Sequence, residues 1–223
     1  MNNNKRIARF VGVLYIIGTV AGILSVVFTG AILGSNNLLL KVSANVNQVK
    51  LGTLFILIMG ISLALVPVVI YPIVKKYNEA LALGYVVFRG ALETFAYIVT
   101  AIWLLLVALS KEYINTGSPD SASFQTMSHL VSNSGEQLHS ITMIIFSLGA
   151  LMFYYLLYQS KLIPKWLSGW GFIAGIIYLA TGVFAMFGTI STFVLLPLAL
   201  QEMVMAVWLI IKGFNPSAKA SKV

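Results

Sequence analysis

Residues 51–74 read LGTLFILIMGISLALVPVVIYPIV, a stretch without a single charged side chain. A helix of this length, rising 1.5 Å per residue, crosses the hydrocarbon core of a bilayer, which is about 30 Å thick. Further uncharged runs occupy residues 10–40, 94–110, 137–160 and 166–201. From these runs we predict six membrane-spanning helices, at residues 10–33, 51–74, 81–108, 136–158, 166–187 and 193–212, with the last two divided near Gly188.

The composition of the chain supports this prediction. Of the 223 residues, 59% are hydrophobic and 9% are charged, and the mean hydropathy is +0.94. Soluble domains contain roughly 45–50% apolar and 25% charged residues, so a soluble globule and a disordered chain are both excluded. The absence of cysteine excludes disulfides and thiol chemistry. We therefore expect an all-α polytopic membrane protein with one transmembrane domain over residues 1–214 and a short cytoplasmic tail at residues 215–223.

Basic residues are divided unevenly between the two sides that six spans define. One set of connecting segments holds Lys5, Arg6, Arg9, Lys75, Lys76, Lys161, Lys165, Lys212, Lys219 and Lys222. The other set holds only Lys41, Lys50 and Lys111. The positive-inside rule therefore predicts that both termini are cytoplasmic. Because this orientation accounts for the excess of positive charge, we expect no nucleic-acid partner.

Charged and titratable side chains inside the predicted spans are the best functional candidates, because an ionised group at the bilayer centre costs roughly 2.5–3.5 kcal/mol. These residues are Arg89, Glu93, Glu136, His139 and Glu202. Counted from the predicted cytoplasmic helix ends, Arg89, Glu93 and Glu202 lie roughly 12, 18 and 15 Å deep. These three share the midplane, whereas Glu136 and His139 lie near the outer interface.

Arg89 and Glu93 stand four residues apart and can pair along one helix face, which Tyr97 extends. Glu202 must find its partner on another helix. If all three charges are present, the cluster sums to minus one, and the surplus carboxylate should hold a proton or attract a cation. Pro197 interrupts the sixth span close to Glu202 and is the predicted hinge. The alternative is a buried ion pair that only fixes helix register.

Glu136 and His139 are secondary polar candidates. Their spacing occurs in di-iron bundles, but such sites need two Glu-x-x-His pairs and two further glutamates. The only other histidine, His129, lies in an outer connecting segment. We therefore predict no metal and no cofactor, and we interpret Glu136 as a polar residue favoured by the dipole at the start of the fourth helix. No recognised motif for hydrolysis or phosphate binding is present, so no catalytic residue is predicted.

Glycines spaced four residues apart let two helix backbones approach closely in lipid. Such pairs occur at Gly18 and Gly22 and at Gly171 and Gly175. We interpret them as intramolecular contacts, with an oligomer interface as the alternative.

Several segments of the chain resemble a bacterial integral-membrane family named domain of unknown function 4386. The resemblance is carried by YLLYQSKLIPKWLSG at residues 155–169, EMVMAVWLIIKG at residues 202–213, RIARFVGVLY at residues 6–15 and FRGALE at residues 88–93. It implies a multipass protein of the bacterial cytoplasmic (inner) membrane and implies no established activity. The residues matched to polar positions of the family are Arg89, Glu93, His139 and Glu202.

Three function classes remain open from the sequence. The first is proton-linked binding or transport of a small solute through Arg89, Glu93 and Glu202. The second is a non-catalytic interaction or regulatory membrane subunit. The third, an intramembrane enzyme, would use Glu136 and His139. The expected partners are the lipid bilayer and a small solute or a proton.

Overall fold

A computed structural model describes residues 3–35, 37–115, 122–188 and 190–216, and every element assigned within these ranges is helical. In chain order the elements are α1 (Asn3–Leu33), α2 (Leu38–Ala44), α3 (Val46–Val74), α4 (Glu79–Tyr85), η1 (Val86–Leu92), α5 (Glu93–Val99), η2 (Thr100–Ile102), α6 (Trp103–Asn115), α7 (Ala122–Ser160), α8 (Lys165–Ala185), η3 (Thr192–Leu195) and α9 (Leu196–Ile211).

Six of the described helical segments are long and apolar enough to cross a membrane. The third segment, Glu79–Asn115, is continuous but combines α4, η1, α5, η2 and α6. The sixth segment, Phe193–Ile211, joins most of η3 to α9. The predicted six-helix membrane fold is therefore confirmed.

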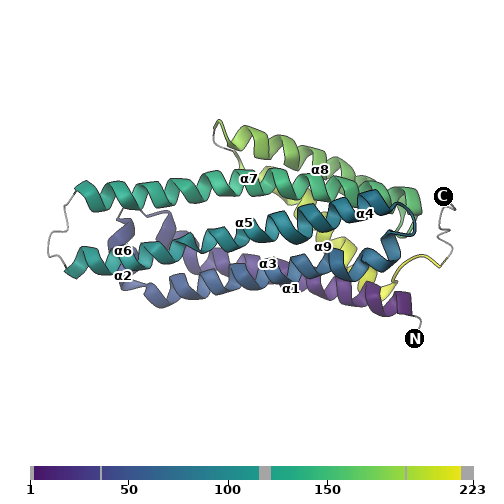
Figure 1. The fold of residues 1–223 in the computed structure, drawn as a ribbon, viewed down its shortest axis with the longest axis horizontal. Coiled ribbons are helices and arrows are strands. Elements are labelled where there is room, and N and C mark those ends of the chain that lie inside the picture. The colour runs from purple at the N-terminus through teal and green to yellow at the C-terminus, as the bar shows by residue number, and fades with distance from the viewer. Residues whose placement is uncertain (1–2, 36, 116–121, 189, 217–223) are drawn as a thin grey trace.

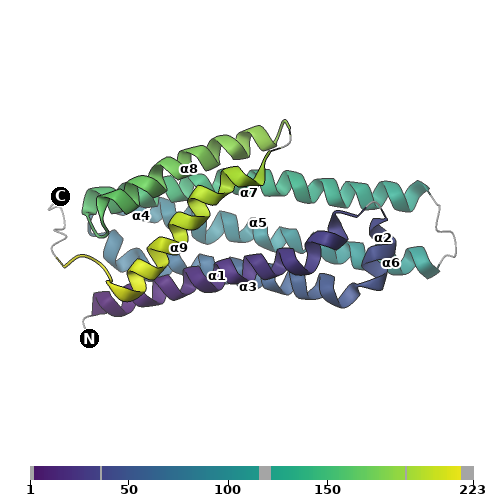
Figure 2. The same ribbon diagram turned by 180° about the vertical axis from the view of Figure 1, so that it is seen from behind.

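The bundle has two different ends (Figures 1 and 2). The start of α1, the end of α9 and the turns that lead into α4 and α8 meet at one end, which we call the terminal end. The opposite end, which we call the distal end, contains α2, α6 and the first part of α7. The hairpin of α8 and α9 rises from the terminal end and covers only part of the bundle's length (Figure 2).

Local sequence signals account for the turns at the terminal end. Asn78 caps α4, because its Oδ1 atom accepts a hydrogen bond of 3.0 Å from the backbone N–H of Leu81. Pro164 directly precedes α8, and Lys161 turns the chain after α7 with a φ angle of 55°. The backbone N–H of Asn215 donates to the carbonyl of Leu162 over 2.8 Å, which fastens the end of the chain to this turn.

Two predicted boundaries are wrong at the distal end. The third segment continues to Asn115 rather than residue 108, and the fourth helix begins at Ala122 rather than residue 136. These extensions are polar enough to escape a search for apolar runs, but they pack against each other as helices. The predicted tail at residues 215–223 lies outside the described residues apart from its first two positions.

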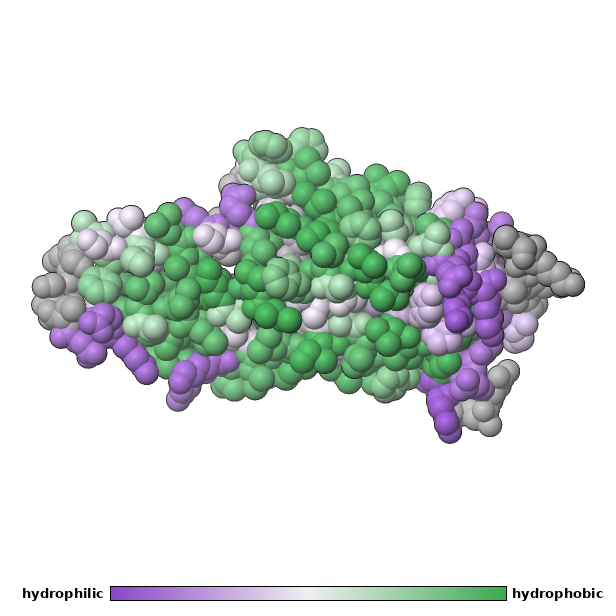
Figure 3. Space-filling view, viewed as in Figure 1, coloured by the Kyte–Doolittle hydropathy of each residue, from purple (hydrophilic) through white to green (hydrophobic). Residues whose placement is uncertain are grey.

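The molecular surface is mostly apolar, and the helices differ in length. Figure 3 shows a broad apolar surface across the middle of the molecule and hydrophilic residues gathered at the terminal end. The 21 residues of α8 span about 32 Å, close to the thickness of the hydrocarbon core. The 39 residues of α7 span about 58 Å, so its first part extends beyond the level at which α8 ends.

The paired glycines face other helices of the same chain. A Cβ atom added to Gly18 would lie 2.7 Å from Leu63 of α3, and one added to Gly171 would lie 2.5 Å from Tyr154 of α7. Gly22 similarly faces Met59, and Gly175 faces Leu151. These glycines therefore contribute to packing within the chain.

Candidate functional site

The midplane cluster begins at an irregularity in the third membrane segment. Arg89 lies in η1, a π-helical turn in which the backbone N–H of Glu93 reaches back to the carbonyl of Phe88. Such turns place an extra residue in the helix and occur frequently at functional sites. A Cβ atom added to Gly149 of α7 would lie 3.2 Å from the Arg89 backbone nitrogen, so this glycine permits α7 to pack closely against the turn.

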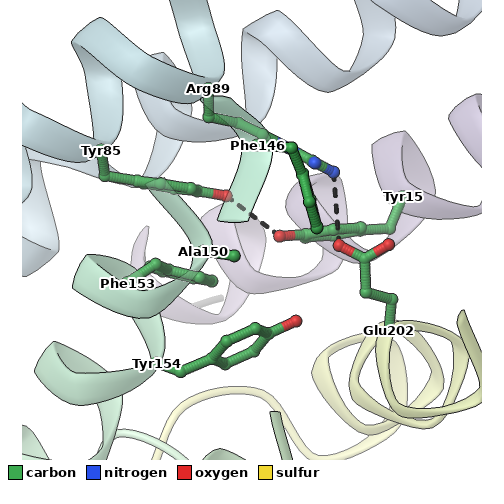
Figure 4. Close-up of a pocket in the computed structure, with 8 residues that line it drawn as sticks. All are labelled: Tyr15, Tyr85, Arg89, Phe146, Ala150, Phe153, Tyr154 and Glu202. Atoms are coloured by element: carbon green, nitrogen blue, oxygen red, sulfur yellow. Dashed lines mark hydrogen bonds and ion pairs between the residues drawn. The ribbon is translucent and has the colours of Figure 1, made fainter. Parts of the chain in front are cut away.

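Arg89 bridges two carboxylates that belong to different membrane segments. Its Nη1 atom donates to both carboxylate oxygens of Glu93, over 3.1 and 3.2 Å. Its Nη2 atom donates to Oε1 of Glu202 on α9 over 3.3 Å (Figure 4). The hydroxyl of Tyr97 donates to Oε1 of Glu93 over 3.0 Å. The structure therefore brings together the three charged residues for which the sequence predicts one depth, with Tyr97 beside them.

The two carboxylates have different surroundings. The side chains of Arg89 and Glu93 are 3% and 1% exposed, whereas that of Glu202 is 16% exposed. Glu93 is held by three hydrogen bonds from charged or hydroxyl donors, while Glu202 receives one. Glu202 is therefore the less constrained and more accessible acid of the cluster.

An aromatic cluster closes the terminal side of the ion pairs (Figure 4). The hydroxyl oxygens of Tyr15 and Tyr85 are 3.0 Å apart, and the Tyr85 ring stacks on Phe153 with centroids separated by 4.3 Å. Tyr154 completes the group, and the space enclosed by these side chains is too small for a water molecule. This aromatic cluster, Tyr15, Tyr85, Phe153 and Tyr154, seals the terminal side of the site.

A hydrogen-bonded chain anchors α9 beside the aromatic cluster. The Tyr154 hydroxyl donates to Oε1 of Gln201 over 2.7 Å, and Nε2 of Gln201 donates to the carbonyl of Leu167 over 3.0 Å. Gln201 is fully buried. Because Gln201 directly precedes Glu202, these bonds fix the face of α9 that presents the carboxylate to Arg89.

A cavity of about 240 Å³ lies on the other side of the ion pair. It is bordered by Arg89, Glu202, Tyr97, His139, Tyr178 and Thr142, together with apolar residues of α1, α3, α7 and α9. On each of α1, α7 and the third segment, the cavity-lining residues lie farther toward the distal end than the residues of the aromatic cluster. The ion pair of Arg89 and Glu202 thus lies between the cavity on its distal side and the aromatic cluster on its terminal side.

The structure separates the two secondary candidates. His139 is exposed and borders the cavity that also contains Arg89 and Glu202, although the depth count had placed it in a separate region. Glu136 lies well inside α7, so its interpretation as a residue at the start of the helix is wrong. Its side chain lies outside the part of the chain that the structure describes. Among the residues that are described, no group of three or more potential ligands forms a metal site.

The structural basis for the predicted hinge also requires correction. Pro197 lies in the first turn of α9, directly after η3, and does not interrupt a continuous helix. A proline inside a helix leaves the carbonyl four residues earlier without its donor, but the carbonyl of Phe193 accepts a hydrogen bond from the backbone N–H of Leu196. Pro197 is therefore a helix-start residue, since proline at this position loses no intrahelical hydrogen bond. Motion at this residue would bend the junction of η3 and α9.

Sequence reasoning missed several residues that shape the site. Tyr15, Phe146, Tyr154 and Gln201 are buried around the cluster, and the guanidinium carbon of Arg89 lies 4.4 Å from the centre of the Phe146 ring. Gln201 offered a signal, because an amide in an apolar run needs a buried partner. The aromatic residues offered none, since they are common in every predicted span.

The fold and this cluster define the chain as a multipass helical membrane protein with an internal charged site. The family model described as "Domain of unknown function (DUF4386)" matches residues 10–213, which is nearly the whole chain. The chain belongs to this family. Comparison with curated proteins and with solved structures yielded no match in either case.

Proposed function

We propose that this protein binds a small solute in the distal cavity and transports it together with, or in exchange for, a proton. In this proposal Glu202 is the proton-binding carboxylate, Arg89 is its counter-ion, and Glu93 with Tyr97 holds Arg89 in place. The observation that carries the proposal is that the ion pair of Arg89 and Glu202 borders a cavity rather than closely packed side chains.

The position of the cavity supports transport over a purely architectural role. A buried ion pair that only fixes helix register needs no adjoining space, and burying charge is costly in itself. Here the cavity lies on one side of the pair and the aromatic cluster closes the other. This is the arrangement expected of one state of an alternating-access carrier, in which only one side of the binding site is open at a time.

The proposed motion would open the aromatic cluster while closing the cavity. The hairpin of α8 and α9 carries Tyr178, Leu198, Ala199 and Glu202, and the other four segments carry most of the remaining residues of the site. Rocking of this hairpin would change the separation of Glu202 from Arg89. The bond from Tyr154 to Gln201 would have to yield in the same movement.

Transport can be tested in proteoliposomes that enclose a pH-sensitive fluorescent dye, which reports proton movement whether or not net charge moves. Amino acids, monocarboxylates, amines and polyols are added separately outside. We expect at least one class to change the luminal pH in the wild type beyond the change in protein-free liposomes, and Glu202→Gln to reduce that proton flux more than about tenfold, because removing one partner of a buried charge pair costs 2–5 kcal/mol.

The matched control is Glu112→Gln, the same chemical change at an exposed site on α6. Its proton flux should equal that of the wild type. Full proton flux from Glu202→Gln, or none from the wild type with any class, would count against proton-linked transport and favour the regulatory-subunit alternative.

We also propose that the terminal end faces the cytoplasm, as the distribution of basic residues indicates. The natural chain contains no cysteine, so single-cysteine variants report orientation without background labelling. In intact cells, a membrane-impermeant maleimide should label Asn47→Cys at the start of α3 and spare Lys76→Cys in the turn before α4. Both native side chains are exposed. The reverse labelling pattern would invert the proposed orientation.

A further inference from the structure

We infer that the solute is a small, mostly apolar molecule with one positive charge, and that this charge and a proton occupy Glu202 in turn. This inference rests on the proposed binding function and names its substrate class. Three observations support it. Arg89 donates two hydrogen bonds to Glu93 but one to Glu202, the cavity wall is largely apolar, and the cluster carries a net negative charge.

The unbalanced charge of the cluster lies on Glu202. Arg89 is shared between two carboxylates, so the three formal charges sum to minus one. Glu93 uses both of its oxygens on Arg89, receives a further hydrogen bond from Tyr97 and is 1% exposed. Glu202 receives a single bond on Oε1, and across the described residues its Oε2 atom has no hydrogen-bond partner. A cation in the cavity would therefore meet a carboxylate with an available oxygen.

An anion is poorly accommodated in the same place. Both terminal nitrogens of Arg89 already donate to carboxylates, and the guanidinium lies against Phe146. Its Nε atom is buried and has no partner among the described residues. The two remaining N–H groups, on Nε and Nη2, do not offset the repulsion of two adjacent carboxylates, so charge selects a cation.

The rest of the cavity wall limits size and polarity. Ile23, Met59, Leu63, Met143 and Leu198 supply most of the apolar lining. The volume of about 240 Å³ is below the range of roughly 300–1,000 Å³ that is usual for drug-sized ligands. Aromatic rings at Tyr97, Phe146 and Tyr178 add electron-rich faces that attract cations. A compact amine with a hydrocarbon or aromatic body fits these walls.

Apart from Arg89, the ionisable groups around Glu202 supply no positive charge at neutral pH, because tyrosine is neutral and histidine is largely neutral under that condition. The charged groups and the histidine are Arg89 on η1, Glu93 on α5 and His139 on α7. The tyrosines are Tyr15 on α1, Tyr85 on α4, Tyr97 on α5, Tyr154 on α7 and Tyr178 on α8. The residues of α3 that border the cavity, Met59 and Leu63, carry no titratable group.

Because of charge balance, Glu202 binds either a proton or the organic cation, and not both at once. One added positive charge brings the cluster to neutrality, and a second would leave a net charge in a largely apolar environment, which is costly. An ammonium that binds when Glu202 is protonated must therefore displace that proton. One ammonium is bound and one proton is released, so the site can perform cation-for-proton exchange.

The test uses three probes of similar shape and different charge: benzylammonium, benzyl alcohol and benzoate. Purified protein is unfolded thermally in detergent with increasing concentrations of each probe, because a ligand of the native state raises Tm by mass action. We expect benzylammonium to raise Tm most. In the pH range where Glu202 is protonated, the apparent Kd of benzylammonium should rise about tenfold for each unit by which the pH is lowered. One proton should be released for each bound probe in the same range.

Substitutions test the charge of Glu202 and the volume of the cavity separately. Glu202→Gln should abolish both the Tm shift by benzylammonium and the proton release, while Glu112→Gln should retain both. Ala199→Phe narrows the cavity without altering the ion pairs, and it should weaken benzylammonium binding even if Glu202→Gln fails to fold.

Several results would overturn the inference. A larger Tm shift with benzoate, or an equal shift with benzyl alcohol, would reject the cation class and leave solute binding in place. The absence of any shift would reject this cation site, whereas the proton-flux assay in proteoliposomes would still decide transport. Proton release that is lost in His139→Gln and kept in Glu202→Gln would reject Glu202 as the exchange site.

Discussion

Arg89→Met should lower the free energy of unfolding by about 3–5 kcal/mol, the usual penalty for leaving a buried charge without its partner. Glu93 is 1% exposed and would keep only the hydrogen bond from Tyr97. Methionine fills part of the space that the arginine occupies. The loss of stability would therefore come more from the missing positive charge than from poorer packing. The measurement is equilibrium unfolding in mixed micelles of dodecylmaltoside and SDS.

A second variant distinguishes charge from packing. Arg89→Met combined with Glu93→Gln removes the stranded carboxylate, and we expect this double variant to regain at least half of the stability lost by the single one. Glu79→Gln, an exposed acid at the start of α4, should remain close to the wild type. A double variant no more stable than Arg89→Met would show that the arginine acts mainly through its shape.

Gly171→Ala should lower the free energy of unfolding by about 1–3 kcal/mol, the usual cost of overfilling a packed interior. The new Cβ atom would lie 2.5 Å from Cε1 of Tyr154 and 2.8 Å from Nε2 of Gln201. Both neighbours are buried and joined by a hydrogen bond, so neither can move without weakening the anchor of α9. Thermal unfolding of the purified variant measures this loss.

Gly169→Ala provides a control on the same helix. Nothing lies within 4 Å of a Cβ atom added there, and alanine is favoured over glycine in a helix by about 0.8–1.0 kcal/mol. The two substitutions should therefore change Tm in opposite directions. A loss of equal size from both would mean that the cost at Gly171 does not come from contact with Tyr154 and Gln201.

The anchor of α9 also links stability to the proposed transport. Gln201 is tied to Tyr154 and Leu167, while its neighbour Glu202 has a single contact with Arg89. One face of α9 is therefore firmly held, and the adjacent face presents a group that is more loosely constrained. This is a suitable arrangement for a carboxylate that exchanges its partner while the helix stays folded.

Much of the site could be predicted because charge in hydrocarbon is costly. Arg89, Glu93 and Glu202 stand out in apolar runs, and counting residues from the helix ends places them at one depth. The count could not show the contact between Arg89 and Glu202, because depth carries no information about which way each helix faces. The π-helical turn at Arg89 was likewise invisible, since no residue type is specific to it.

His139 and Pro197 show where the prediction from the sequence failed. His139 was counted as too far from the midplane to share a site with Glu202, yet one cavity reaches both. The depth count treated each residue as a point, whereas a cavity extends along several helices at once. Pro197 was placed inside a helix because the apolar run continues through it, but the chain begins a new helix there.

By itself, the sequence determined the six membrane helices, the uneven distribution of basic residues and the depth of the midplane charges. These properties depend on the transfer of each residue between water and hydrocarbon, which composition along the chain already expresses. Tertiary structure alone decided that Arg89 reaches Glu202, that aromatic rings seal one side and that a cavity lies on the other. Those features depend on how helices rotate and pack, and such contacts join residues far apart in the chain.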